Sequence, residues 1–172
     1  MGLFTSDNPV FEMLKADHEK VKKIFDEFKE AKGRSRSQLV AEAIKELDVH
    51  TALEETLIYP AIRGAINEDD LMDEALEEHH VAHVLIQELK RMSASDERYA
   101  AKFTVLGESV KHHIREEEGE MFPKAEKAEI SWEHLHEQVL KRKEALLAKK
   151  QQTNKGHAPK GSIQRNPKSS ST

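Results

Sequence analysis

Apolar residues recur along the chain at alternating steps of three and four, which is the spacing of one face of an α-helix. Four long segments show this pattern, each with a single apolar stripe and a charged opposite face. They cover residues 8–32, 37–62, 68–92 and 96–127. Long helices joined by short connections pack as antiparallel neighbours, so the pattern predicts an all-α fold built as an up-and-down four-helix bundle.

The sequence changes character after the fourth segment. A shorter, strongly charged helix is predicted over residues 131–150, with enough apolar positions to lie against the bundle. Residues 151–172 are rich in Lys, Ser, Gly and Pro and show no apolar periodicity, a composition typical of disorder. We therefore expect residues 1–150 to form the bundle domain with an additional C-terminal helix, and residues 151–172 to be a disordered basic tail.

Composition narrows the possible chemistry. The chain contains no Cys, so it can form neither disulfides nor thiolate metal ligands, and any metal must be held by His, Asp or Glu. Acidic side chains outnumber basic ones, 32 to 27, although residues 149–172 contain no acidic side chain. An acidic helical body repels phosphate, so we expect no nucleic-acid partner, while the basic tail is a candidate for binding an acidic partner.

Hydropathy along the chain bears on location. No window is long and apolar enough to predict a membrane span, which needs roughly 18 consecutive apolar residues. The first residues lack the basic-then-apolar pattern of a signal peptide. We expect a cytoplasmic protein.

The strongest signal is an internal repeat in the second and fourth predicted helices. Residues 50–60 and 113–123 both read His-x3-Glu-Glu-x3-aromatic-Pro. Residues four apart in an α-helix project in nearly the same direction, so each repeat presents a His and a Glu as a chelating pair. The third helix carries a similar pair of histidines, and the first has one histidine on its apolar stripe. The candidate ligands are His18, His50, Glu54, His79, His83, His113 and Glu117.

All seven candidate ligands lie on apolar stripes and are expected to meet inside the bundle. A single core histidine is more often hydrogen-bonded than metal-binding, but seven buried polar groups together are very costly unless a metal compensates them. Glu55 and Glu118 are turned by about 100° from their neighbours and are expected to hydrogen-bond the ligands from behind or to face solvent. The remaining histidines fall at helix flanks or outside the four helices; these are His80, His112, His134, His136 and His157.

The donor set indicates the type of metal. Imidazole and carboxylate donors without sulfur suit iron, zinc, copper or manganese. Two six-coordinate ions offer about twelve positions, and five imidazoles, two bridging carboxylates and one bridging oxo or hydroxo group leave about one position open. An open position on an ion that changes valence suits dioxygen, peroxide or nitric oxide as a ligand. We therefore predict two iron ions in a non-haem centre.

These residues and spacings resemble the haemerythrin family, including its bacterial members with the HHE cation-binding domain, over about residues 9–127. The resemblance implies that one iron is held by His79, His83 and His113 and the other by His18 and His50. It implies that Glu54 and Glu117 bridge the two. Classical members place the second carboxylate, an Asp, five residues after its His, whereas Glu117 follows His113 by four residues. That departure matches the HHE-type pattern.

The resemblance implies a protein that binds dioxygen or a related small ligand, for oxygen or iron sensing, storage, or a response to oxidative stress. A centre with only two anionic ligands supports high-valent iron less well than the four-Glu centres of oxygen-activating bundles, which favours binding over hydroxylation. Two alternatives stay open. One is a di-iron enzyme with peroxidase-like or oxidase activity at the same centre. The other is a metal-free helical bundle with a structural or interaction role.

Overall fold

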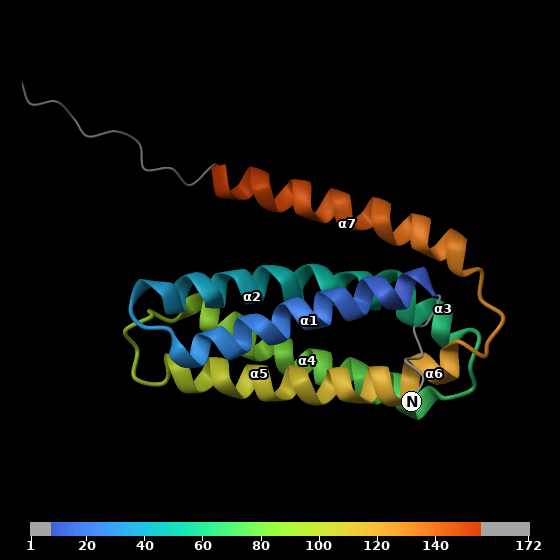
Figure 1. The fold of residues 1–172 in the computed structure, drawn as a ribbon, viewed down its shortest axis with the longest axis horizontal. Helices are drawn as coiled ribbons and strands as arrows, with labels where there is room; N and C mark the ends of the chain where they lie inside the picture. The colour runs from blue at the N-terminus through green and yellow to red at the C-terminus, as the bar shows by residue number, and fades with distance from the viewer. Residues whose placement is uncertain (1–7, 156–172) are drawn as a thin grey trace, which may run out of the picture.

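The computed structural model describes the backbone of residues 8–155 and the side chains of residues 8–150, and all regular structure in this range is helical (Figure 1). Four rods form the bundle, and two of them are built from three consecutive segments. The elements are α1 (Pro9–Glu30), α2 (Arg34–Leu53), η1 (Glu54–Ile58), α3 (Tyr59–Arg63), α4 (Asp69–Arg91), α5 (Tyr99–Glu116), η2 (Glu117–Met121), α6 (Phe122–Ala125) and α7 (Trp132–Lys155).

The rods follow one another as an up-and-down bundle in which α1 pairs with α2 and α4 pairs with α5 (Figure 1). Helix α1 begins where Asn8 accepts hydrogen bonds from the backbone of Val10 (3.0 Å) and Phe11 (3.4 Å), while Pro9 occupies the first helical position. The turn into α2 contains Gly33, whose positive φ of 55° suits a residue without a Cβ. The predicted all-α four-helix bundle is confirmed.

Two apolar clusters make up the core, one at each end of the bundle. Each rod passes from one cluster to the other at a single buried histidine. Along α1, for example, Leu14 belongs to one cluster and Val21 to the other, and His18 lies between them. The same order holds for His79 in α4, between Ala75 and Ala82, and in α2 and α5 the change of cluster falls next to His50 and His113. The four histidines therefore form a polar layer between two apolar ones.

The apolar periodicity predicted that the second and fourth rods would be continuous α-helices, and the structure differs from this prediction. Each contains one π-helical turn, η1 and η2, in which the backbone N–H of Tyr59 donates to the carbonyl of Glu54 and that of Phe122 donates to the carbonyl of Glu117. Pro60 follows the first turn, and a proline ring in a regular helix presses on the carbonyl four residues earlier. A wider turn relieves this contact, and it brings a residue onto the face of the residue five positions before it.

Helix α7 packs along the outside of the bundle against α1, α2 and η1 (Figure 1). Its Leu135 and Val139 are buried, and its backbone continues five residues past the predicted end at residue 150. Most of the predicted disordered tail, and with it His157, lies outside the described residues. Within the described range, no helix has the length and apolarity needed to cross a membrane.

Candidate metal centre

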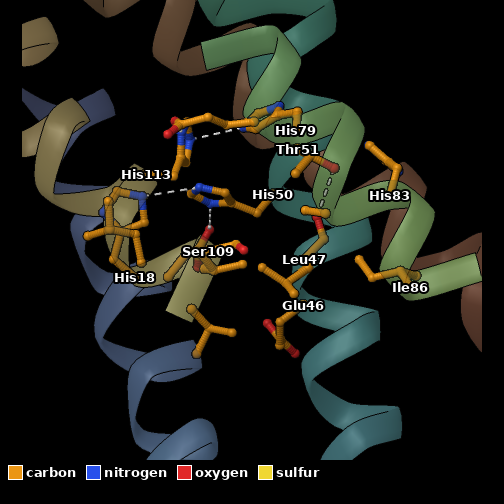
Figure 2. A pocket seen from close by; sticks show the side chains of 16 residues that line it. His18, Glu46, Leu47, His50, Thr51, His79, His83, Ile86, Ser109 and His113 are labelled. Carbon is orange, nitrogen blue, oxygen red and sulfur yellow. Dashed lines mark hydrogen bonds and ion pairs between the residues drawn. The ribbon is translucent and has the colours of Figure 1, made fainter. Parts of the chain in front are cut away.

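Six of the seven candidate ligands lie together in the polar layer of the bundle. Four histidines project into it, one from each rod, and Figure 2 shows His18, His50, His79 and His113 turned toward one another. Two glutamates come from the first residues of η1 and η2, where the side chains of Glu54 and Glu117 are 0% and 1% exposed. The repeat therefore brings its two His-Glu pairs into one buried site.

The donor atoms form two overlapping groups. In the first, His18, His50, Glu54 and Glu117 each offer one atom, and all these atoms lie within 4.8 Å of one another. In the second, Glu54 stands with His79 and His113 in the same way. The Nε2 atoms of His18 and His50 are 3.2 Å apart, and those of His79 and His113 are 3.0 Å apart. Glu54 belongs to both groups, so it is placed to serve two ions at once.

His83 is the one candidate that the structure does not bring into these groups. It lies one turn beyond His79 on α4, but its side chain is 40% exposed and its Nε2 is 3.3 Å from Oε1 of Glu55. In Figure 2 it stands apart from the four converging histidines. It lines the same cavity as His79, and its role as a ligand stays a prediction.

A carboxylate stands behind each of the four buried histidines, on the Nδ1 side of the ring. The four pairs are His18 with Glu118 at 2.7 Å, His79 with Glu55 at 2.9 Å, His113 with Glu78 at 2.7 Å and His50 with Asp17 at 3.6 Å. A carboxylate that accepts from Nδ1 leaves the lone pair of Nε2 facing inward, as metal ligation requires. The hydrogen-bonding role expected of Glu55 and Glu118 is confirmed.

Sequence reasoning missed Asp17 and Glu78 as partners of the centre. Each is the acidic residue directly before a buried histidine, His18 or His79, and each reaches across to the histidine of the next rod. The signal was present, since an acidic residue followed by His occurs at equivalent places in the first and third helices. The centre thus has an approximate twofold repeat in its outer carboxylates as well as in its inner donors.

The two inner carboxylates test whether a cation fits this site. Both carboxylate oxygens of Glu54 and Oε2 of Glu117 are fully buried, and they find no hydrogen-bond partner among residues 8–150. An ionised carboxylate in such a place is strongly unfavourable unless positive charge faces it. The donor set, four imidazole Nε2 atoms around two such carboxylates, fits a pair of metal cations.

The electrostatics of the layer lead to the same requirement for positive charge. Burial opposes protonation of His50, but the charge of Glu54 and the contact with Asp17 raise the pKa of this imidazole to about 10. Burial likewise opposes ionisation of Glu54, yet His50 and His79 hold the pKa of its carboxyl well below its usual value. The carboxylates therefore draw protons or metal ions to the same ring nitrogens, and the two compete for them.

Tyr59 is a further residue of the centre that sequence reasoning missed. Its hydroxyl donates to Oε1 of Glu117 at 2.7 Å and lies 3.2 Å from Nε2 of His113 and 3.3 Å from Nε2 of His79. The π turn η1 carries it there. At the equivalent position of the repeat Phe122 stacks on His18, with ring centroids 6.1 Å apart. The aromatic residue of the repeat was therefore the available signal.

An apolar cavity borders the histidine layer on the side away from Tyr59, Glu54 and Glu117, none of which lines it. Its walls come from all four rods, one turn away from the buried histidines. The apolar lining residues are Val21, Leu47, Ala82, Ile86, Val110 and Ile114. The imidazoles thus have Glu54 and Glu117 on one side and a mainly apolar cavity on the other, which Asp17, Glu46 and Glu78 also line. Figure 2 shows the side chains that line this cavity.

The Hemerythrin HHE cation binding domain is the family description that matches the chain, over residues 10–125. The chain belongs to this haemerythrin family. A crystal structure of a haemerythrin HHE cation-binding domain-containing protein from Mycobacterium kansasii is similar, with a TM-score of 0.73 and 26% identity. The match covers 86% of this chain and 92% of that one. The predicted family is therefore confirmed, and with it a metal-binding helical bundle.

A curated relative of this haemerythrin-family chain is described as a DNA nickase from Nostoc sp. strain PCC 7120. The two are 28% identical over 122 residues, which is 70% of this chain but 34% of the relative. The chain thus spans about a third of that protein's length.

The other histidines within the described residues lie away from the inner donors. His80 and His134 are exposed, and His136 is half-buried on α7. His112 is exposed as well, with its Nε2 3.1 Å from Glu116 and 3.4 Å from Glu78. His80 therefore provides an inert neighbour with which to compare His79.

Tyr59→Phe should separate the metal-free state from the metal-loaded one. In metal-free protein the change removes the hydroxyl that satisfies Glu117, and leaving a buried carboxylate oxygen without a donor costs about 1–3 kcal/mol. Metal-loaded protein should lose less, because a cation satisfies the same carboxylate. Urea unfolding with and without chelator measures both values. Tyr99→Phe, at a buried tyrosine of α5 outside the centre, is the matched control, and an equal loss in both states would contradict the prediction.

Proposed function

We propose that this protein holds a non-haem di-iron centre and uses it to bind dioxygen or a related small ligand such as peroxide or nitric oxide. One observation carries the proposal. Two buried carboxylates, Glu54 and Glu117, have oxygens with no hydrogen-bond partner among the described residues, and four imidazole Nε2 atoms face them beside an apolar cavity. In the cell such binding serves oxygen or iron sensing, storage, or a response to oxidative stress.

The two donor groups suggest how the ions are shared. His18 and His50 would hold one ion and His79 and His113 the other. Glu54 would serve both because it belongs to both groups. Glu117 would serve both because its Oε2 lies 3.3 Å from Nε2 of His18 and 3.4 Å from Nε2 of His113. We assign His83 to the second ion as well, because it follows His79 by one turn and lines the same cavity. When bound, a pair of irons supplies a change of valence and an open coordination position.

The cavity suits a small uncharged ligand. Its apolar walls keep bulk water from the imidazole layer, and they offer contacts to a molecule without charge. The hydroxyl proton of Thr51, which also lines it, is donated to the carbonyl of Leu47 at 2.9 Å. A ligand entering the cavity thus meets mainly apolar atoms.

The acidic groups at the cavity favour binding over turnover. Reduction of peroxide to water needs protons at the bound ligand, and the acidic residues that line the cavity are Asp17, Glu46 and Glu78. Glu46 is paired with Lys20 at 2.8 Å. Burial would raise the pKa of the Asp17 and Glu78 carboxyls, but His50 and Lys143 lower it for Asp17, and His113 lowers it for Glu78. Both therefore stay ionised near neutral pH, and neither is a ready proton donor. This supports a binding role over the peroxidase-like alternative.

Metal analysis and visible spectroscopy test the proposed function. Protein loaded anaerobically with ferrous iron should retain two irons per chain after desalting. Exposure to air should change its visible spectrum, and removal of oxygen should reverse that change. Steady consumption of hydrogen peroxide over many turnovers would instead support the enzyme alternative. Failure to retain iron, with intact helical structure by circular dichroism, would support the metal-free alternative.

A further inference from the structure

We propose that Lys143 of helix α7 is a positioning residue for the metal centre, because it competes with His50 for the carboxylate of Asp17. By drawing Asp17 away, Lys143 leaves His50 without the outer carboxylate support that the other three buried histidines have. The proposal rests on the metal centre proposed above. It makes α7 a determinant of how firmly one half of the centre holds its metal.

The distances show the competition directly. The ammonium group of Lys143 donates to both oxygens of Asp17, at 2.8 and 2.7 Å. The nearer oxygen of Asp17 is 3.6 Å from Nδ1 of His50, too far for a hydrogen bond. Nδ1 of His50 is accordingly buried with no hydrogen-bond partner in the part of the chain whose side chains are described.

The other three histidines provide the comparison. Their Nδ1 atoms lie 2.7–2.9 Å from the outer carboxylates of Glu118, Glu55 and Glu78. Glu78 is the counterpart of Asp17 in the repeat, and it divides its oxygens: one accepts from His113, and the other lies 3.4 Å from His112. Asp17 has a side chain one carbon shorter, and both its oxygens are taken by Lys143. The long contact between Asp17 and His50 therefore occurs in the half of the centre next to α7, where Lys143 holds Asp17.

The pair lies where its charge affects the centre. The side chains of Asp17 and Lys143 are 17% and 22% exposed, so water screens the pair less than it screens a surface ion pair. Helix α7 is held in place by the buried Leu135 and Val139 and by a second ion pair between Lys150 and Asp48, 2.9 Å apart. It also lies beyond residues 10–125, which match the family. This influence on the centre therefore comes from a segment outside the family domain.

Hydrogen bonding to an outer carboxylate makes an imidazole a better metal ligand, and losing such a partner typically costs about 10–100-fold in metal affinity. Removing Lys143 frees Asp17 to accept from His50. Lys143→Met should therefore slow release of ferrous iron to an excess of chelator, by about 3–10-fold in the more slowly released ion. Asp17→Asn should leave release close to the wild-type rate, because the carboxylate of Asp17 is too far from His50 for a hydrogen bond in the wild type. Adding Lys143→Met to Asp17→Asn should change nothing further, because both act through the same carboxylate.

The matched control is Lys150→Met, which removes an ion pair of the same helix that touches no ligand. It should leave iron release unchanged. Lys143→Arg keeps a cation that can pair with both oxygens of Asp17, and it should behave as the wild type does. Faster release in Lys143→Met, or equal changes in Lys143→Met and Lys150→Met, would overturn the proposal, since either result means that Lys143 only anchors α7.

A second readout uses the metal-free protein, so it holds even if iron is not the metal. In nitrogen-15 NMR of the histidine rings, Lys143→Met should shift the Nδ1 proton of His50 downfield as its hydrogen bond to Asp17 forms. The ring protons of His79 and His113 should stay in place. An unchanged His50 signal would refute the competition. If the wild type binds no iron but the His50 signal shifts in Lys143→Met, the proposed function is refuted and the competition for Asp17 is still supported.

Discussion

Glu54→Gln should remove most of the bound metal and should also make the metal-free protein less stable than the wild type. Glu54 belongs to both donor groups, so its loss affects both ions rather than one. Glutamine keeps the shape of the side chain but removes the charge and one ligating oxygen. We expect metal content after desalting to fall at least tenfold. Losing an outer hydrogen-bond partner typically lowers metal affinity about 10–100-fold, and losing a ligand should lower it further.

The stability half of this prediction follows from the burial of Glu54. Both of its oxygens are buried, and Nε2 of His50 and Nε2 of His79 lie 3.1 and 3.3 Å from them. These imidazoles hold the pKa of the Glu54 carboxyl well below its usual value, so in the metal-free protein the carboxylate belongs to a buried ion pair. Removing one partner of a buried ion pair is strongly destabilising. Metal-free Glu54→Gln should therefore unfold at a lower urea concentration than metal-free wild type.

Two comparisons sharpen the test of Glu54. Glu120→Gln changes an exposed carboxylate of η2 whose partner is Lys124, and it should alter neither metal content nor stability. His79→Ala should lose metal while His80→Ala, one residue away and exposed, should not. Full metal content in Glu54→Gln would show that this carboxylate is not a ligand.

The buried positions of the centre could be predicted because the bundle is regular there. Helical spacing from His50 to Glu54 and from His113 to Glu117 orients each pair, and the apolar stripe says that each pair faces inward. Burial then follows from amphipathicity alone, and the structure places all four side chains inside the bundle. Local periodicity is sufficient to predict burial where the helix is regular and no contact with a distant part of the chain decides the position of the side chain.

Tyr59 could not be placed by the same reasoning. In a regular helix a residue five positions after Glu54 is turned by about 140° from it, which puts it on another face. The π turn η1 removes most of that difference, and only then does the hydroxyl reach Glu117. The sequence contains the cause of the π turn, since Pro60 directly follows Tyr59. Helical periodicity cannot say, however, whether the helix forms a wider turn before the proline or kinks at it.

His83 and Lys143 show two other limits of the sequence. His83 shares the spacing of His79, but it lies at the edge of the stripe, where a small rotation of α4 decides whether a side chain is inside or half-exposed. Lys143 meets Asp17 across 126 positions of sequence. That contact depends on how α7 docks, and no periodicity within either helix describes it.

Removal of metal should lower the thermal midpoint of the wild-type protein by about 10 °C. A ligand present at about a thousand times its dissociation constant stabilises the folded state by about 4 kcal/mol. For a chain of this size each kcal/mol shifts the midpoint by about 2–4 °C. In the metal-free protein, raised imidazole protonation compensates the carboxylates only in part, because Oε2 of Glu117 and both oxygens of Glu54 still have no hydrogen-bond donor among residues 8–150.

Calorimetric melts of iron-loaded and chelator-treated protein measure this difference. The same pair of melts on Glu54→Gln is the internal control, since a variant that binds no metal should give one midpoint under both conditions. His80→Ala should show the full wild-type difference. Coincident wild-type midpoints would mean that protonated histidines balance Glu54 and Glu117 completely, and the bundle would then need no cation to hold its polar layer together.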